Sequence, residues 1–245
     1  MEWADVAIVL SVRAHGETAA ILEALTQTHG RHLGLVHGGA SRKSKCTLQP
    51  GNTLRLAWRA RLNEQLGSFH AEPLRVRAGG ILEKRTALAG LNAFTTVVSA
   101  VLPEREPHRG VYEAAELLLD AIEENDVRHW LPLYVRWEAG LLEDLGFGLD
   151  LSHCAATGTT DDLIYVSPRS GRGVSREAGA PYADRLLALP SFLLASQNAS
   201  ISPGDLRSGL KLTAHFLVER VLRPHGKELP AARVRLQELA MRESL

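Results

Sequence analysis

The stretch NTLRLAWRARL, residues 52–62, alternates apolar and mostly basic side chains. Its apolar side consists of Leu54, Leu56, Trp58, Ala60 and Leu62, and its other side of Arg55, Ala57, Arg59 and Arg61. A period of two residues is typical of a β-strand with one buried face and one solvated face. The stretch therefore predicts a strand whose outer face carries arginines.

Four more segments of the N-terminal part are candidate strands: residues 3–13, which alternate loosely, and residues 19–30, 31–39 and 67–77. Each is short, and glycines mark most of the turns between them. Five short strands with such turns within about 80 residues predict a small barrel that is closed or partly closed.

A long basic window surrounds the quoted strand. From Ala24 to Asn63 the chain has no Asp or Glu, and part of the window is the Gly-bounded loop HGGASRKSKCTLQPG, residues 37–51. The basic residues of the window are Arg31, Arg42, Lys43, Lys45, Arg55, Arg59 and Arg61. Such a cluster is typical of a phosphate-binding surface, so these seven residues are the predicted contacts to nucleic acid. Because aromatic residues are few here, we expect binding through phosphates, with strong salt dependence and little sequence preference.

The net charge of zero conceals an uneven distribution. Residues 1–78 contain ten basic and six acidic side chains, and the remainder is acidic by the same margin. This asymmetry predicts two domains with different partners. We therefore predict a nucleic-acid-binding domain at 1–78 and a second domain at 79–245.

From about Gly79 the apolar residues recur at helical spacing. A first helix is predicted within residues 85–106, ending before Pro103. Further helices are predicted over residues 111–126, 130–148 and 182–195, and from Ser202–Pro203 to just before Pro224. Residues 152–180 interrupt this pattern with Gly, Ser, Thr and Asp, and LIYVSPRSGRGVS, residues 163–175, predicts a hairpin. The predicted fold class is therefore α+β: a barrel followed by a helical domain with a short β insertion.

The sequence offers no recognisable catalytic constellation. Neither a G-x-S-x-G turn nor a G-x-x-x-x-G-K-[ST] loop is present. Asp161 and Asp162 are adjacent and typical of a turn, and His29, His32 and His37 have no nearby cysteine or acid to complete a zinc site. No catalytic residue, cofactor or metal is therefore predicted, and we expect a protein that is not an enzyme.

Cellular location is predicted from cysteine usage and apolar runs. Cys46 and Cys154 are far apart and form no disulfide framework, which favours a reducing compartment. The N-terminus has no basic region before its apolar run, and no run of 18 apolar residues exists. We expect a cytoplasmic protein without a membrane span.

Three segments of the chain are distinctive: residues 7–45, the run YVRWEAGLLEDLGFGLDLSHC at 134–154, and GLKLTAHFLVERVL at 209–222. They resemble the bacterial RecO family of DNA repair and recombination mediators. The resemblance extends over essentially the whole chain. It implies that the N-terminal barrel is an oligonucleotide-binding (OB) fold and that the basic window forms its DNA surface.

The same resemblance implies a function and partners. RecO-like proteins bind single- and double-stranded DNA and anneal complementary strands. They contact the acidic C-terminal tail of the single-stranded DNA-binding protein SSB, and with the partner RecR they help to load the RecA recombinase. Arg136, beside Trp137, matches the family position expected to contact the SSB tail. The alternative for Arg136 is an ordinary surface ion pair with Glu143 or Asp144.

The sequence departs from the family in the β insertion. Many members hold a zinc ion there with four cysteines, whereas this chain keeps Cys154 alone and has Ser175 and Ala178 on the far side of the hairpin. The resemblance thus implies a degenerate zinc-finger-like hairpin without metal.

Two alternatives to a DNA repair mediator remain open on the residues. An RNA-binding OB-fold protein would present the same basic strand face. A hydrolase or nuclease would need His and Asp residues in a site, and the missing motifs argue against it.

Overall fold

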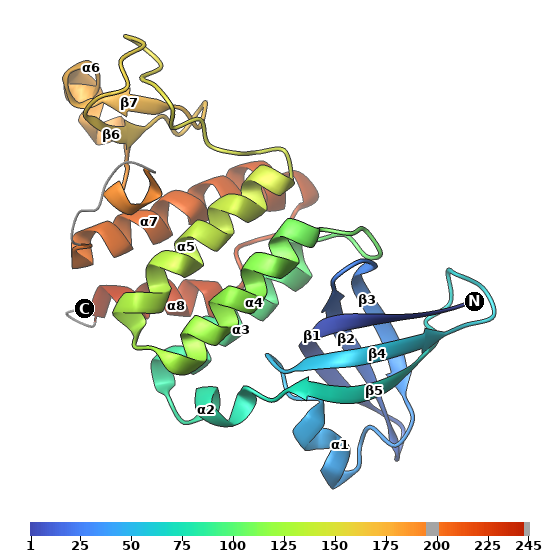
Figure 1. Cartoon of the computed structure of the whole chain (residues 1–245). Helices are drawn as coiled ribbons and strands as arrows, with labels where there is room; N and C mark the ends of the chain where they lie inside the picture. The colour runs from blue at the N-terminus through green and yellow to red at the C-terminus, as the bar shows by residue number, and fades with distance from the viewer. Residues whose placement is uncertain (195–200, 243–245) are drawn as a thin grey trace. The chain divides into compact units, whose positions relative to one another are not determined.

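The computed structural model describes residues 1–194 and 201–242. The chain forms two compact units, Met1–Asp126 and Val127–Leu245. The first contains the N-terminal strands and the helices that follow them, and the second contains the remaining helices and a small sheet (Figure 1). The domain boundary predicted near residue 78 stays a prediction.

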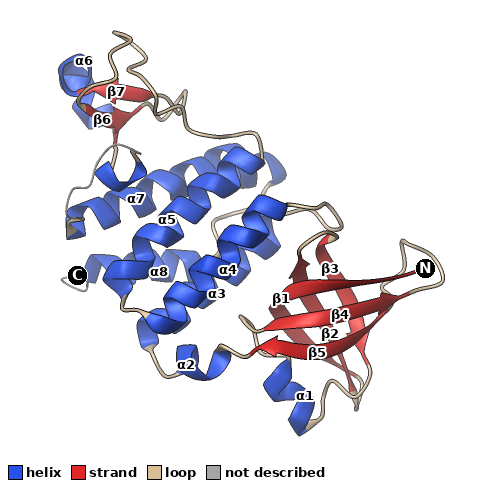
Figure 2. Cartoon of the chain, viewed as in Figure 1, coloured by secondary structure: helices blue, strands red, loops and turns tan. Residues whose placement is uncertain are grey.

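The five predicted strands form a closed barrel in the order β1-β2-β3-β5-β4, which Figure 2 shows as a ring of red arrows. Their bounds are β1 Glu2–His15, β2 Ala19–Thr26, β3 Gly30–Val36, β4 Thr53–Arg59 and β5 Ser68–Arg75. Neighbouring strands are antiparallel, except that β3 and β5 run parallel and share the single pair Leu35 and Ser68. This ring confirms the α+β class with an OB-like N-terminal barrel.

The period-two pattern of β4 explains how the barrel fills its interior. Leu54, Leu56 and Trp58 are at most 1% exposed, whereas Arg55 and Arg59 lie outside. Their side chains join a core contributed by every strand of the barrel. Burying an aliphatic side chain contributes about 1.5–3 kcal/mol, so the apolar face of each strand determines the register of the sheet.

The basic loop contains a helix that the sequence did not predict. Arg42–Thr47 form α1, between β3 and β4, and the side chain of Ser41 caps its N-terminus by accepting a hydrogen bond from the Ser44 N–H at 3.2 Å. No residue of α1 is buried. A helix without an apolar stripe leaves no periodic signal in the sequence.

Three helices complete the first unit: α2 Ala78–Leu82, α3 Arg85–Val101 and α4 Arg109–Glu124. The predicted helices at 85–106 and 111–126 are confirmed in position, and α3 ends before Pro103 as expected. Their apolar faces are buried around Phe94, Val98, Leu119 and Ile122.

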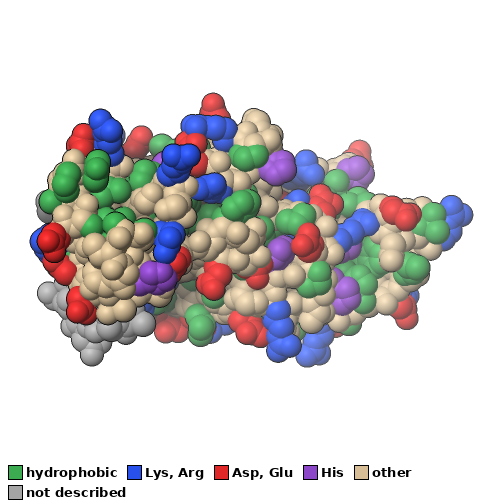
Figure 3. Space-filling model, turned by 90° about the horizontal axis from the view of Figure 1, so that it is seen from above, with side chains coloured by type: hydrophobic (Ala, Val, Ile, Leu, Met, Phe, Trp, Pro, Cys, Tyr) green, Lys and Arg blue, Asp and Glu red, His purple; other side chains and the backbone are tan. Residues whose placement is uncertain are grey.

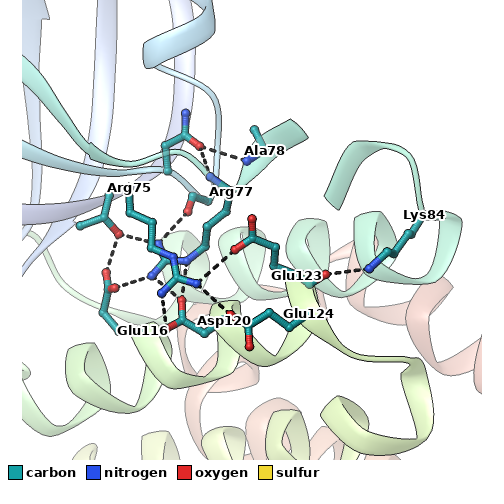
Figure 4. Close-up of polar contacts among 11 residues, drawn as sticks. Arg75, Arg77, Ala78, Lys84, Glu116, Asp120, Glu123 and Glu124 are labelled. Carbon is teal, nitrogen blue, oxygen red and sulfur yellow. Dashed lines mark hydrogen bonds and ion pairs between the residues drawn. The ribbon is translucent and has the colours of Figure 1, made fainter. Parts of the chain in front are cut away.

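A buried arginine joins the barrel to α4. The side chain of Arg77 is 0% exposed and forms ion pairs with Glu116 and Asp120, both at 2.6 Å (Figure 4). It also donates to the Thr53 hydroxyl at 2.6 Å. Arg75 lies nearby but is 40% exposed, and it pairs with Asp120 and two further acids of α4.

The helices of the second unit are α5 Val127–Asp144, α7 Pro203–Phe216 and α8 Ala231–Arg242. A π-helical stretch, η3 Leu217–Leu222, and a short 3₁₀ turn, η4 Arg223–His225, extend α7. Ser202 and Asp205 form a capping box at the start of α7. Gly146 follows α5 with a φ of +83°, a left-handed conformation that suits glycine just after the end of a helix.

An ion pair is enclosed among these helices. Glu138 on α5 and Arg233 on α8 are both 0% exposed, and the Arg233 Nε lies 2.6 Å from a Glu138 carboxylate oxygen. Arg233 also donates to the Leu210 carbonyl of α7 at 2.9 Å. The pair therefore ties all three helices together.

The β insertion is a three-stranded sheet in the order β7-β6-β8. Its elements are β6 Leu163–Val166, β7 Gly173–Ser175, β8 Leu187–Ala188 and the short helix α6 Arg176–Gly179. The predicted hairpin is present, and β8 adds a strand that was not predicted. The helix predicted over 182–195 is wrong within the described residues: the segment consists of 3₁₀ turns at Ala180–Arg185 (η1) and Ser191–Leu193 (η2) on either side of β8. Residue 195 itself lies outside the described residues. Pro190 interrupts the apolar run that suggested the helix.

Among the described residues, no helix has the length and apolar character needed to cross a membrane.

Candidate nucleic-acid interface

A groove of about 920 Å³ lies on the barrel. Residues of β1, β4 and β5 line it together with the end of β3 and with α1. Arg59 and Glu2 belong to its lining, as do His37, Ser44 and His70. The groove thus reaches from the basic helix α1 to the last residue of β4.

Aromatic rings underlie this groove but are largely enclosed. Trp58 is 1% and Phe69 is 4% exposed. Trp3 is half-buried and stacks on His29, with ring centroids 4.2 Å apart. Burial lowers the pKa of the neighbouring His32, which disfavours the positively charged form of its ring. The groove therefore offers few open rings for base stacking, which favours contacts to phosphates.

The cations of α1 are free to meet a ligand. Arg42, Lys43 and Lys45 are all exposed, and no acidic residue lies in the first turn of this helix. Ser44 lines the groove between them. Three cations on one exposed turn beside a groove are suited to holding a phosphate backbone.

The predicted arginines of β4 also lie on the surface, but acids accompany them. Arg59 forms an ion pair with Glu2 at 2.7 Å, and both side chains are more than 60% exposed. Arg55 lies opposite Glu72 in the pairing of β4 with β5. Arg61 is exposed in the connection after β4. An exposed pair contributes about 0–1 kcal/mol, so Arg59 can exchange Glu2 for a phosphate at little cost.

Arg31 is placed differently from the other six. Its side chain is 14% exposed, pairs with Glu23 at 2.8 Å, and donates to the Leu102 carbonyl at 2.9 Å. Acids from outside the window thus reach Arg31, Arg55 and Arg59, because strand pairing joins residues that are distant in sequence. The structure brings α1 and Arg59 to one groove and binds Arg31 into the barrel wall.

Besides Glu2, which pairs with Arg59, three polar residues of the groove were not predicted: Ser44, Ser68 and His70. The sequence contains a weak indication of each of these three residues. Ser44 stands within the basic loop, and Ser68 and His70 alternate on the strand predicted at 67–77. His37 was considered for zinc and instead lines the groove.

The wider surface has no dominant sign of charge in the view of Figure 3. Lys and Arg side chains, in blue, alternate there with Asp and Glu, in red. The exposed cations of α1 are therefore a better guide to a phosphate-binding surface than the net charge of the protein is.

Arg136 lies in the second unit, on α5. It is exposed, and its Nε and Nη2 donate to the Phe192 carbonyl at 3.0 and 2.7 Å. Guanidinium donors remain for a carboxylate ligand, since the group has five N–H bonds. Its contact with the SSB tail stays a prediction.

Comparison with known proteins identifies the family. Residues 1–77 match the family model "Recombination protein O N terminal", and residues 82–229 match "Recombination protein O C terminal". The chain belongs to the RecO family. A protein named DNA repair protein RecO from Phenylobacterium zucineum is 53% identical over 96% of this chain and 95% of its own length. Proteins of the same name from Caulobacter vibrioides and Methylorubrum populi are 51% and 49% identical, over at least 95% of each chain. This confirms the predicted resemblance and places the chain in DNA repair and recombination.

The zinc site that many RecO proteins are expected to carry does not fit the donors of this chain. Cys154 is buried, and its sulfur accepts a hydrogen bond from the Ser175 N–H at 3.3 Å. Burial alone would raise the pKa of Cys154, but hydrogen bonds from Ser175, Thr157 and the Ala156 backbone lower it to about 6. Within the described residues, no three His, Cys, Asp or Glu side chains are grouped to hold a metal ion. One thiol among hydroxyls is a poor donor set for structural zinc, and the zinc-finger-like character of the insertion stays a prediction.

Proposed function

We propose that this RecO-family chain is a recombination mediator that works without catalysing a chemical step. It binds single- and double-stranded DNA through the barrel and anneals complementary strands. With RecR it helps to load RecA onto SSB-coated single strands. Its proposed site of action is the cytoplasm.

One observation carries the DNA-binding part of this proposal. The exposed cations Arg42, Lys43 and Lys45 stand on α1, the helix whose Ser44 lines the groove that contains Arg59. Phosphate contacts of this kind do not depend on base identity, so they suit a protein that must act at any gap or break. Arg55 and Arg61 extend the same surface, and Arg136 is the proposed contact for the acidic SSB tail.

Annealing of labelled complementary oligonucleotides tests the proposal. We expect the protein to accelerate pairing equally with and without ATP, because no phosphate-binding nucleotide loop is present in the sequence. Acceleration that requires ATP would contradict it. Cleavage of the strands in Mg²⁺ or Mn²⁺ would show an enzyme instead.

Competition between matched DNA and RNA oligonucleotides completes this test. We expect DNA to compete at least as well as RNA for the site. Preference for RNA would favour the alternative of an RNA-binding OB-fold protein.

A further inference from the structure

The connection between β4 and β5, residues 60–67, presents apolar side chains to solvent. We call it the β4–β5 loop. Leu62 is 48% and Leu66 is 39% exposed, and Arg61 is exposed beside them. Leucines held on a surface are costly to hydrate, so packing against an apolar ligand surface is favourable for them.

Hydrogen bonds hold this loop in one conformation. The Met1 amino group donates to the Ala60 carbonyl at 2.7 Å, and the Ala60 N–H returns a bond to Met1 at 3.0 Å. The Trp58 indole N–H, inside the barrel, donates to the Leu66 carbonyl at 3.0 Å. Both ends of the loop are thus attached to the barrel, so its backbone cannot move inward without breaking these bonds.

Arg105 fixes the middle of the loop. Its guanidinium donates to the carbonyls of Asn63 and Gln65, and its own N–H donates to the Arg31 carbonyl at 2.8 Å. Its φ is +64°, a left-handed conformation that non-glycine residues rarely adopt. Backbone strain persists where the surroundings impose it, often at functional positions. The strained residue here is the one that holds the exposed loop in place.

The chemistry of the loop fits a nucleobase better than a phosphate. Glu64 is exposed in the same loop and weakens the attraction of its tip for phosphates. Leucines contact the flat faces of bases once the bases are unstacked, and DNA-binding proteins insert such side chains between base steps. The loop between strands 4 and 5 is also one of those that OB-folds use for oligonucleotides.

We propose that the β4–β5 loop is a wedge for DNA bases. Leu62 and Leu66 pack against unstacked bases where a duplex opens into a single strand, while Arg61 contacts the adjoining phosphate. This inference rests on the proposed DNA binding by the barrel and adds a means of separating or holding bases for pairing.

A fluorescent base tests the wedge. We place 2-aminopurine, which brightens when it unstacks, at the junction of a duplex and a single-stranded tail. The wild-type protein is expected to raise the fluorescence on binding. The double variant Leu62→Ser, Leu66→Ser is expected to lose at least about half of this rise while the salt dependence of binding, set by phosphates, is retained.

A matched control replaces another exposed leucine of the same unit. Leu117 on α4 is 71% exposed, so Leu117→Ser changes hydration similarly and should leave the fluorescence rise intact. Circular dichroism and melting temperature confirm that each variant is folded.

The outcomes separate the wedge from the DNA-binding proposal. Wild-type protein that binds the junction without a fluorescence rise would overturn the wedge and leave DNA binding standing. A full fluorescence rise with the double variant would overturn the wedge too. If that variant also lost SSB binding, the loop would be a contact for SSB and not for bases. Wild-type protein that binds no DNA would overturn the proposed function itself.

Discussion

Replacing Arg77 by methionine is expected to lower the free energy of unfolding of the first unit by about 2–4 kcal/mol. Methionine keeps most of the volume but leaves Glu116 and Asp120 without their buried counter-ion. Removing one partner of a buried ion pair usually costs about 3–5 kcal/mol, and the two acids reduce that cost because each remains about 30% exposed. The change should appear as a lower denaturant midpoint and as faster amide exchange in β4 and α4.

Arg75 provides the matched control within the same network. It contacts Asp120 too, but it is 40% exposed, so Arg75→Met should cost about 0–1 kcal/mol. Equal losses from the two substitutions would contradict the view that burial, rather than the number of ion pairs, determines the stability of this junction.

Replacing Arg233 by methionine is expected to destabilise the second unit by about 3–5 kcal/mol. Here both partners are completely buried, so Glu138 would be left without its main counter-ion. Arg233 also lies over the ring of Tyr134, 5.6 Å from its centroid, and that contact would be lost as well. Segment-resolved hydrogen exchange on α5, α7 and α8 measures the effect, because two units need not unfold as one.

A second substitution distinguishes charge from packing. Adding Glu138→Gln to the Arg233→Met variant removes the uncompensated charge and should recover a substantial part of the loss. Arg235→Met, on the exposed side of the same helix, should change stability by less than about 0.5 kcal/mol. No recovery in the double variant would show that packing, and not charge, explains the effect.

The barrel could be predicted from sequence because period-two patterns record burial directly. The strand at 52–62 shows this most clearly, since its alternation is the alternation of exposure found in β4. The helix α1 could not be predicted in this way, because none of its residues is buried. The helix expected over 182–195 was wrong because its apolar residues pack as 3₁₀ turns and a strand around Pro190.

The distribution of charged residues along the sequence indicated where exposed cations lie, but not which acids form ion pairs with them. The acid-free window correctly located the exposed cations of α1, but it could not show that Glu23 would pair with Arg31 or Glu2 with Arg59. Those contacts arise from strand order. For the same reason Arg77 and Arg233 carried no sign of burial in the sequence, where a lone arginine is expected on the surface.

The salt dependence of single-stranded DNA binding tests the central claim most directly. We compare the wild type with one triple variant of α1, which carries Arg42→Gln, Lys43→Gln and Lys45→Gln together. The control is a second triple variant that removes the same charge from exposed sites of the second unit, Lys211→Gln, Arg235→Gln and Arg242→Gln. At about 0.7 per phosphate contact, loss of the three α1 contacts should reduce the slope of log K against log salt by about 2, and the control should keep the wild-type slope. An unchanged slope in the folded α1 variant would contradict the account and place the DNA on another surface.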